Sequence, residues 1–166
     1  FDIYWLIKTI YLSTLVRTSF FVMRRNLKTD WLPKLATLTE NAHLPGVTWQ
    51  DLQHLIILPA YKEPYKIIHD ALEAIAKSNY PLDKMMVVLA TEERAGEHGT
   101  QLAQQAQDKF GQTFGHFLTT VHPDHLVGEQ AGKGSNEAWA GHRAKELIDS
   151  LGITYDRVVV SVFDID

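Results

Sequence analysis

Two carboxylates, Asp164 and Asp166, end the last apolar segment of the chain and are separated by one residue. The segment before them, 158–163, reads Val-Val-Val-Ser-Val-Phe and predicts a strand that is buried on both faces. Alternate residues of a strand point to the same side, so we expect the two carboxylates to lie close together. Because they would repel each other, a divalent cation with oxygen ligands is the natural third party. The alternative is the start of an ordinary loop, where Asp is common.

A glycine-rich cluster precedes a segment with helical character, and it reads Gly132-Lys133-Gly134-Ser135-Asn136. Glycines let backbone amides approach an anion, Lys133 adds a positive charge, and the start of a helix adds its dipole. The spacing is not that of a P-loop, because Gly128 is one residue too close to Gly132 and glycine occupies position 134, where Ser or Thr would hold magnesium. The cluster predicts an anion-binding loop, and the alternative is a flexible loop before a helix.

Polar residues also follow two other apolar segments. The first is followed by Pro59-Ala60-Tyr61-Lys62-Glu63, in which a ring and a carboxylate suit a nucleobase and its ribose, although an ordinary turn is the alternative. The second is followed by Glu92 and Glu93. The run His122-Pro-Asp-His125 has ligand-type residues but no further His or Cys at a familiar metal spacing, so it predicts a surface turn.

The elements that position these residues alternate along the chain. Apolar segments predict strands and helical periodicity predicts helices, at 55–58, 64–76, 85–90, 97–110, 117–121, 132–151 and 158–163. This order predicts an α/β fold, a Rossmann-like open parallel sheet with helices on both faces. Ligands bind such sheets outside the carboxyl ends of the strands, which is where the polar clusters fall.

Composition narrows the classes of protein. The 166 residues are 45% hydrophobic and 22% charged, which is typical of one globular domain. A net charge of -4 argues against a nucleic-acid partner. The absence of Cys excludes disulfides and thiolate metal sites. The chain begins with Phe and stops on a motif, so we expect it to be a piece of a longer protein.

Residues 1–29 predict an apolar or amphipathic helix next to a membrane. Lys8 and Arg17 interrupt its apolar residues more often than is usual for a spanning helix of about 20 residues. A basic stretch follows, as expected for the cytosolic surface of a membrane, and contains Arg24, Arg25, Lys28 and Lys34. The alternative is packing against the domain or a missing neighbour. Residues 30–53 predict a linker, so the folded domain is expected over 54–166.

From residue 55 to 166 the chain resembles the nucleotide-binding half of a family 2 glycosyltransferase with the GT-A fold. Three motifs carry the resemblance, in the family's order: Pro59-x-Tyr61-x-Glu63, Gly132-Lys133 and Asp164-x-Asp166. The N-terminal segment also resembles that of membrane-attached, processive members such as cellulose and hyaluronan synthases and related bacterial enzymes. The resemblance implies a membrane-associated hexosyltransferase of bacterial polysaccharide biosynthesis, with its catalytic domain facing the cytoplasm.

The resemblance implies roles for the residues that face the donor's nucleoside. Pro59, Tyr61 and Glu63 would line the pocket for the base and ribose of a UDP- or GDP-linked sugar. Glu92 or Glu93 would assist there, where the family usually has Asp.

The resemblance also implies roles for the residues near the diphosphate. Lys133 would approach it together with Asn136, Asp164 would contact the ribose or the metal, and Asp166 would ligate Mg²⁺ or Mn²⁺. The metal and Lys133 would stabilise the charge on the leaving diphosphate. The general base, the acceptor site and the stereochemical outcome would depend on residues beyond Asp166. The donor-binding half is therefore expected to be inactive alone, with a glycan or lipid as the unnamed acceptor of the whole enzyme.

Two other readings remain open. A sugar nucleotidyltransferase also uses a parallel sheet, a glycine-rich loop and metal-binding Asp, but normally has a glycine-rich, Arg-containing loop where Pro59-Ala-Tyr-Lys-Glu63 stands. The other is a non-catalytic module that binds nucleotide or scaffolds a membrane complex.

Overall fold

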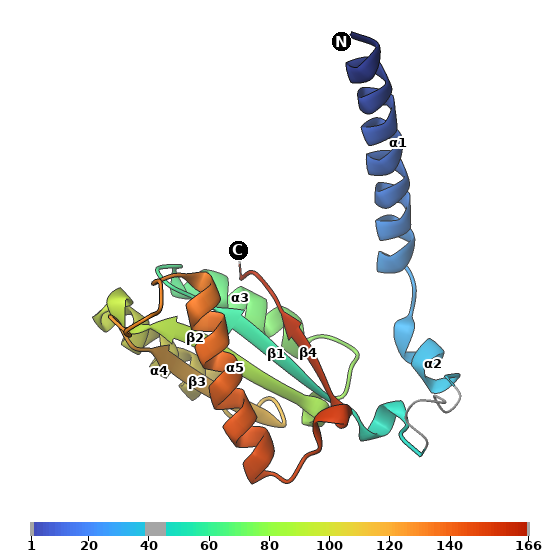
Figure 1. The fold of residues 1–166 in the computed structure, drawn as a ribbon. Coiled ribbons are helices and arrows are strands. Elements are labelled where there is room, and N and C mark those ends of the chain that lie inside the picture. The colour runs from blue at the N-terminus through green and yellow to red at the C-terminus, as the bar shows by residue number, and fades with distance from the viewer. Residues whose placement is uncertain (1, 39–45, 166) are drawn as a thin grey trace. The chain divides into compact units, whose positions relative to one another are not determined.

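The computed structural model describes residues 2–38 and 46–165, and the chain divides into two compact units, 1–38 and 39–166 (Figure 1). The first unit contains helices α1 (Asp2–Leu27) and α2 (Trp31–Ala36). Asp30 caps α2, because its side chain accepts a hydrogen bond from the backbone N–H of Leu32. The expected linker over 30–53 therefore contains a short helix.

The C-terminal part of the stretch 30–53 packs in the second unit. Residues Trp49–Asp51 form a 3₁₀ turn, and the Trp49 ring lies 6.4 Å from that of Tyr80 in the second unit. The Thr48 and Asp51 side chains close this turn through reciprocal capping hydrogen bonds. The last part of the stretch thus belongs to the folded unit.

The second unit is a four-stranded, all-parallel sheet with the strand order β3-β2-β1-β4. Its elements follow one another as the sequence predicts: β1 (Gln53–Pro59), α3 (Tyr65–Ala76), β2 (Met85–Glu92), α4 (Glu97–Phe110), β3 (His116–His122), α5 (Lys133–Ser150) and β4 (Val158–Val162). The Rossmann-like prediction is confirmed. All four strands run the same way, so the segments that follow them emerge at one edge of the sheet.

Helices cover both faces of the sheet, with α5 on one side and α3 and α4 on the other (Figure 1). Successive β1 residues alternate between these layers: Ile56 and Leu58 pack with α3 and α4, whereas Leu55 and Ile57 pack with α5. The central strand β2 is buried along its whole length. Its continuous apolar run follows from this double coverage.

The end of α5 is set by Gly152, which has a φ of +67°. Glycine adopts this left-handed conformation without the strain that a Cβ brings. The backbone N–H of Ile153 then donates to the carbonyl of Ile148 at 3.2 Å. This turn directs the chain from the helix back towards β4.

The prediction that the strand over 158–163 is buried on both faces is wrong for this structure. Among the described strands, β4 pairs only with β1 and lies at the edge of the sheet. Val160 is 55% exposed and Val162 is 46% exposed. Apolar composition shows that a strand can be buried, but its place in the strand order decides whether neighbours cover it.

Candidate functional site

Two of the predicted motifs meet at the carboxyl edge of the sheet through an ion pair. The Nζ of Lys133, the first residue of α5, lies 2.9 Å from Oδ2 of Asp164, which follows β4. The backbone N–H of Phe163 donates to the carbonyl of Ile57 and continues the pairing of β4 with β1 up to this point. Both partners remain open to solvent, because the side chains of Lys133 and Asp164 are 50% and 67% exposed. The pair is therefore accessible to a ligand.

The start of α5 has the features of an anion-binding helix terminus. The helix is 18 residues long, and the first N–H groups of any α-helix lack partners within the helix. A Cβ built on Gly132 or Gly134 would meet no atom within 4 Å, so the space beside this loop is open. Ser135 fixes the preceding loop, because its hydroxyl donates to the carbonyl of Gln130 at 2.5 Å. Lys133 is the cationic side chain of this terminus.

The segment after β1 forms a tight turn closed by Glu63. Its Oε2 accepts a hydrogen bond from the backbone N–H of Tyr61 at 2.6 Å. The half-buried Tyr61 ring has two cations over it, with the guanidinium carbon of Arg94 at 4.3 Å from the ring centroid and the Nζ of Lys62 at 4.8 Å. Pro59 ends β1 beneath this turn. The carboxylate that was predicted to bind ribose is thus engaged with its own turn.

The two glutamates after β2 have different surroundings. Glu92 is only 4% exposed, and its Oε2 accepts a hydrogen bond from Nε of Arg94. This hydrogen bond is the main cause that raises the pKa of Arg94 above its ordinary value. Glu93 is exposed, and its Oε2 accepts from the backbone N–H of Asp124 at 2.9 Å. Glu92 is therefore the buried carboxylate of this edge, and Glu93 braces the loop after β3.

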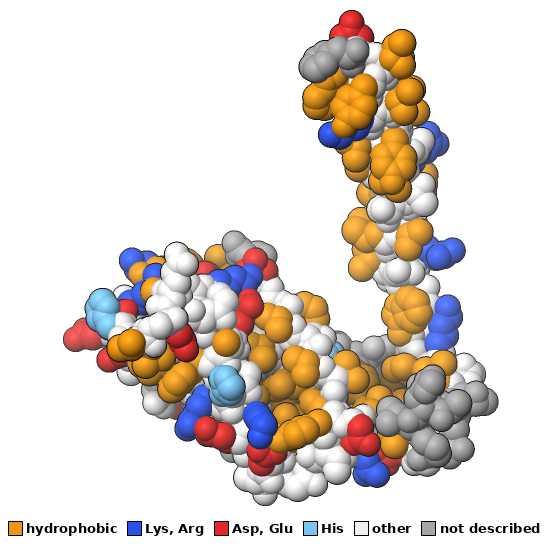
Figure 2. All heavy atoms as spheres, viewed as in Figure 1, with side chains coloured by type: hydrophobic (Ala, Val, Ile, Leu, Met, Phe, Trp, Pro, Cys, Tyr) orange, Lys and Arg blue, Asp and Glu red, His pale blue; other side chains and the backbone are white. Residues whose placement is uncertain are grey.

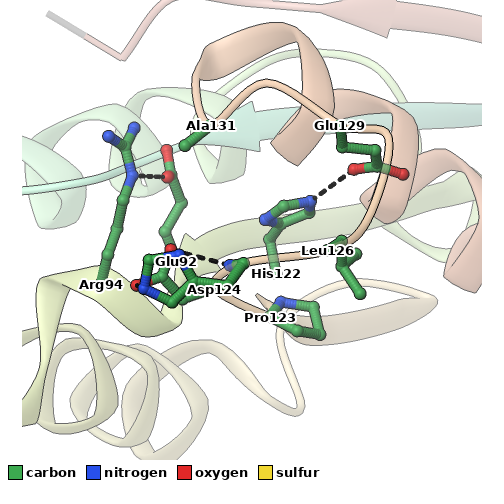
Figure 3. Close-up of a pocket in the computed structure, with 9 residues that line it drawn as sticks. Glu92, Arg94, His122, Pro123, Asp124, Leu126, Glu129 and Ala131 are labelled. Atoms are coloured by element: carbon green, nitrogen blue, oxygen red, sulfur yellow. Dashed lines mark hydrogen bonds and ion pairs between the residues drawn. The ribbon is translucent and has the colours of Figure 1, made fainter.

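A pocket of about 190 Å³ lies between the ends of β2 and β3 (Figure 3). Arg94 and Glu92 form one side of it, and His122 lies across from them. His122 is buried, its Nε2 is 3.0 Å from Oε2 of Glu129, and its ring meets that of Trp139 edge-on at 5.9 Å. The pocket is lined by Glu92, Arg94, His122, Pro123, Asp124, His125, Leu126, Glu129 and Ala131.

The pocket connects the predicted motifs. Arg94 contacts Tyr61 on one side, and Ala131 of the same lining stands two residues before Lys133. Arg94 is not among the site residues that the sequence predicts, and His122 was predicted to lie in a surface turn. His122 is the last residue of β3. Because ligands bind parallel sheets at the carboxyl ends of their strands, this position could have indicated His122 as a site residue.

Asn136 lies deeper than the other predicted site residues. It is 1% exposed, and its Nδ2 donates to the carbonyl of Ala90 in β2 at 2.8 Å. Its Oδ1 is buried and has no hydrogen-bond partner within the described ranges. Asn136 therefore ties the first turn of α5 to the sheet. The predicted contact of Asn136 with a nucleotide sugar would require this buried side chain to rearrange.

The exposed carboxylate of Asp164 supplies oxygen atoms of the kind that hard divalent cations prefer, and it is paired with Lys133. Within residues 2–38 and 46–165, no group of three or more His, Asp or Glu side chains is close enough to hold a metal by itself. Asp166, the predicted metal ligand, lies outside the described residues. A cation beside Asp164 would therefore need oxygens from a bound ligand or from outside the described part of the chain.

No protein-family model matches the chain. No curated protein matches it either.

Proposed function

We propose that this chain is the donor-binding part of a metal-dependent glycosyltransferase that uses a nucleotide-diphosphate sugar. The observation that carries the proposal is the Lys133–Asp164 ion pair, which joins an anion-binding helix terminus to an exposed carboxylate. Lys133 and Asp164 are 31 positions apart in the sequence (164 − 133), so the fold brings the two motifs together. The third motif contains Tyr61, which lies at the same edge of the sheet. Tyr61 contacts Arg94, and Arg94 lines the pocket there.

The proposed chemistry at the diphosphate uses charges that are already in place. Lys133 and the amides at the start of α5 bind the diphosphate oxygens, and Lys133 exchanges the Asp164 carboxylate for phosphate. Asp164 is then available to a Mg²⁺ or Mn²⁺ ion, with Asp166 as the second protein ligand. A bound divalent ion supplies positive charge where the leaving diphosphate becomes more negative. Lys133 stabilises the same charge, because it lies at the helix terminus that faces it.

The proposed nucleoside contacts lie at the ends of β1 and β2. Tyr61 offers an aromatic surface to the base, and Glu63 holds the turn that presents this ring. The buried Glu92 offers a carboxylate oxygen to base N–H groups, while Glu93 keeps the neighbouring loop in position. As the resemblance implies, the donor is expected to be a UDP- or GDP-linked sugar, and the acceptor site and general base are expected to depend on residues beyond Asp166.

Membrane association through α1 is part of the same proposal. The helix has 26 residues, about 39 Å at 1.5 Å per residue, and is long and apolar enough to cross a membrane. Hydrophobic side chains occur along its length (Figure 2). Residues 4–7 are all apolar, and their side chains point to all sides of the helix because successive residues are rotated by about 100°. This all-round pattern favours a span over a helix lying on the surface, and a signal sequence has the same appearance.

The experiment is a titration of the 166-residue chain in detergent with UDP, GDP and the matching triphosphates, with Mn²⁺ present. The transferase proposal expects a diphosphate to bind more tightly than its triphosphate, and expects Asp166→Ala to weaken that binding. A triphosphate that binds more tightly favours the nucleotidyltransferase. A folded sample that binds none of them favours a scaffold and contradicts the proposal.

A further inference from the structure

Arg94 has hydrogen-bonding capacity that its contacts do not use. Its Nε donates to Glu92 and its guanidinium lies over the Tyr61 ring. Within the described part of the chain, neither of its two Nη groups has a hydrogen-bond partner. These groups point away from Glu92 in Figure 3, and Arg94 lines the pocket. Arg94 is thus positioned by two contacts and has N–H donors that a ligand in the pocket can use.

Glu92 provides the matching acceptor beside these donors. Arg94 binds its Oε2, and no hydrogen bond from another described residue reaches Oε1. Both side chains line the same pocket. A donor and an acceptor are therefore fixed next to each other, and their complement is a ligand edge that carries a carbonyl beside an N–H group.

The charges around the pocket exclude a phosphate as its occupant. Apart from its two histidines, the pocket lining has one cation, Arg94, against three carboxylates: Glu92, Asp124 and Glu129. A phosphate group here would be repelled, whereas a neutral, flat ring would not. The volume of about 190 Å³ is below the roughly 300–1,000 Å³ of pockets for whole ligands, so it suits one part of a nucleotide.

We propose that Arg94, which contacts Glu92 and Tyr61, selects nucleotide sugars whose base has a ring carbonyl next to an imino N–H, as in uracil and guanine. This inference rests on the proposed function. An Nη–H group of Arg94 donates to the carbonyl, and Oε1 of Glu92 accepts the adjacent imino N–H. Cytosine and adenine carry an amino group in place of that carbonyl and an unprotonated nitrogen in place of the imino group. Their edges therefore place donor against donor and acceptor against acceptor, so they are rejected.

The test measures the affinity of the 166-residue chain in detergent for two matched pairs of nucleotides, with Mn²⁺ present throughout. UDP and CDP differ only in this edge of the base, and so do IDP and ADP. In the pair that binds more tightly, the carbonyl-bearing member is expected to bind about tenfold or more tightly than the amino-bearing member. Arg94→Ala is expected to reduce this ratio to less than about threefold, whereas Arg143→Ala, which removes an exposed arginine of α5, leaves it unchanged.

The wild-type ratio decides the inference even if Arg94→Ala does not fold. Ratios near one in both pairs, or a preference for CDP or ADP, would overturn the role given to Arg94 while leaving nucleotide binding intact. A folded Arg94→Ala variant that keeps the full wild-type ratio would overturn it too. Failure of the wild-type chain to bind any of the four nucleotides would overturn the proposed function and this inference together.

Discussion

The ammonium group of Lys133 and the carboxylate of Asp164 are 2.9 Å apart at the carboxyl edge of the sheet. Lys133 begins the helix after β3, and Asp164 follows β4, although β2 and β1 lie between β3 and β4 in the strand order. The chain after β3 therefore passes β2 and β1 before α5 begins next to the end of β4. Both side chains are half or more exposed, and an exposed ion pair contributes at most about 1 kcal/mol to stability. The pair therefore contributes little to folding, and Lys133 can exchange Asp164 for a ligand at small cost, as the proposed function requires.

Lys133→Ala should weaken binding of the tighter of UDP and GDP by about 10- to 100-fold. The variant removes a charge-assisted contact to phosphate, which is worth roughly 1.5–3 kcal/mol. Binding of the free nucleoside should change little, because it has no phosphate for Lys133 to contact. Isothermal titration of both ligands measures the difference.

The matched control is Lys145→Ala, further along the same helix. Lys145 pairs with Asp149 at 2.8 Å, one helical turn away, and does not face the pocket. Its removal should leave nucleotide affinity within about twofold of the wild type. Equal losses in the two variants would mean that Lys133 has no specific role.

His54 should make the second unit less stable in mild acid. Its ring bonds the hydroxyl of Ser161 at 2.9 Å between β1 and β4, and burial lowers the pKa of His54 from its ordinary 6.5. The unfolded chain then binds protons at His54 more readily than the folded chain, so this contribution to stability is present above pH 6.5 and is lost as the pH falls through the lower folded pKa. Urea unfolding at pH 7.5 and pH 5 measures the loss.

His54→Gln should lose less stability between these two pH values than the wild type, because glutamine does not titrate. His142→Gln is the matched control, since His142 is exposed on α5. A wild-type chain that is as stable relative to His54→Gln at pH 5 as at pH 7.5 would refute the account of His54.

Two glycines of the α5 region should respond to alanine with opposite signs. Gly152→Ala places a side chain at a φ of +67° and should destabilise the chain by about 1–2 kcal/mol. Gly141 lies inside α5, where an added Cβ meets no atom within 4 Å, so Gly141→Ala should stabilise it by roughly 0.5–1 kcal/mol. Thermal or urea unfolding of both variants tests the pair, and two changes of the same sign would contradict it.

Helix α1 should hold the chain in membranes in a way that salt does not reverse. Lys8 and Arg17 lie against aromatic rings of their own helix, with Nζ of Lys8 at 4.9 Å from the Trp5 ring. The whole chain should stay with anionic vesicles in 1 M salt, a concentration that screens charges beyond about 3 Å. A chain that begins at residue 46 should remain in the supernatant. Release of the whole chain by salt would indicate a helix bound at the surface instead.

The helices and strands of the second unit are predictable from the sequence, because each one depends on the spacing of apolar residues within a short segment. The seven elements of the second unit lie close to their predicted bounds for this reason. The exposure of β4 was not predictable, since strand order is a tertiary property. The pairing of Arg94 with Glu92 was missed because its significance depends on Tyr61, more than 30 residues earlier, reaching the same place.

The most direct test of the proposed donor site is the metal dependence of nucleotide binding by the wild-type chain and Asp164→Asn. Titration with UDP or GDP is done once with Mn²⁺ and once with EDTA. We expect Mn²⁺ to tighten wild-type binding by about tenfold or more, and Asp164→Asn to lose most of this gain. Binding that is equally tight in Mn²⁺ and EDTA, or a full Mn²⁺ effect in Asp164→Asn, would contradict it.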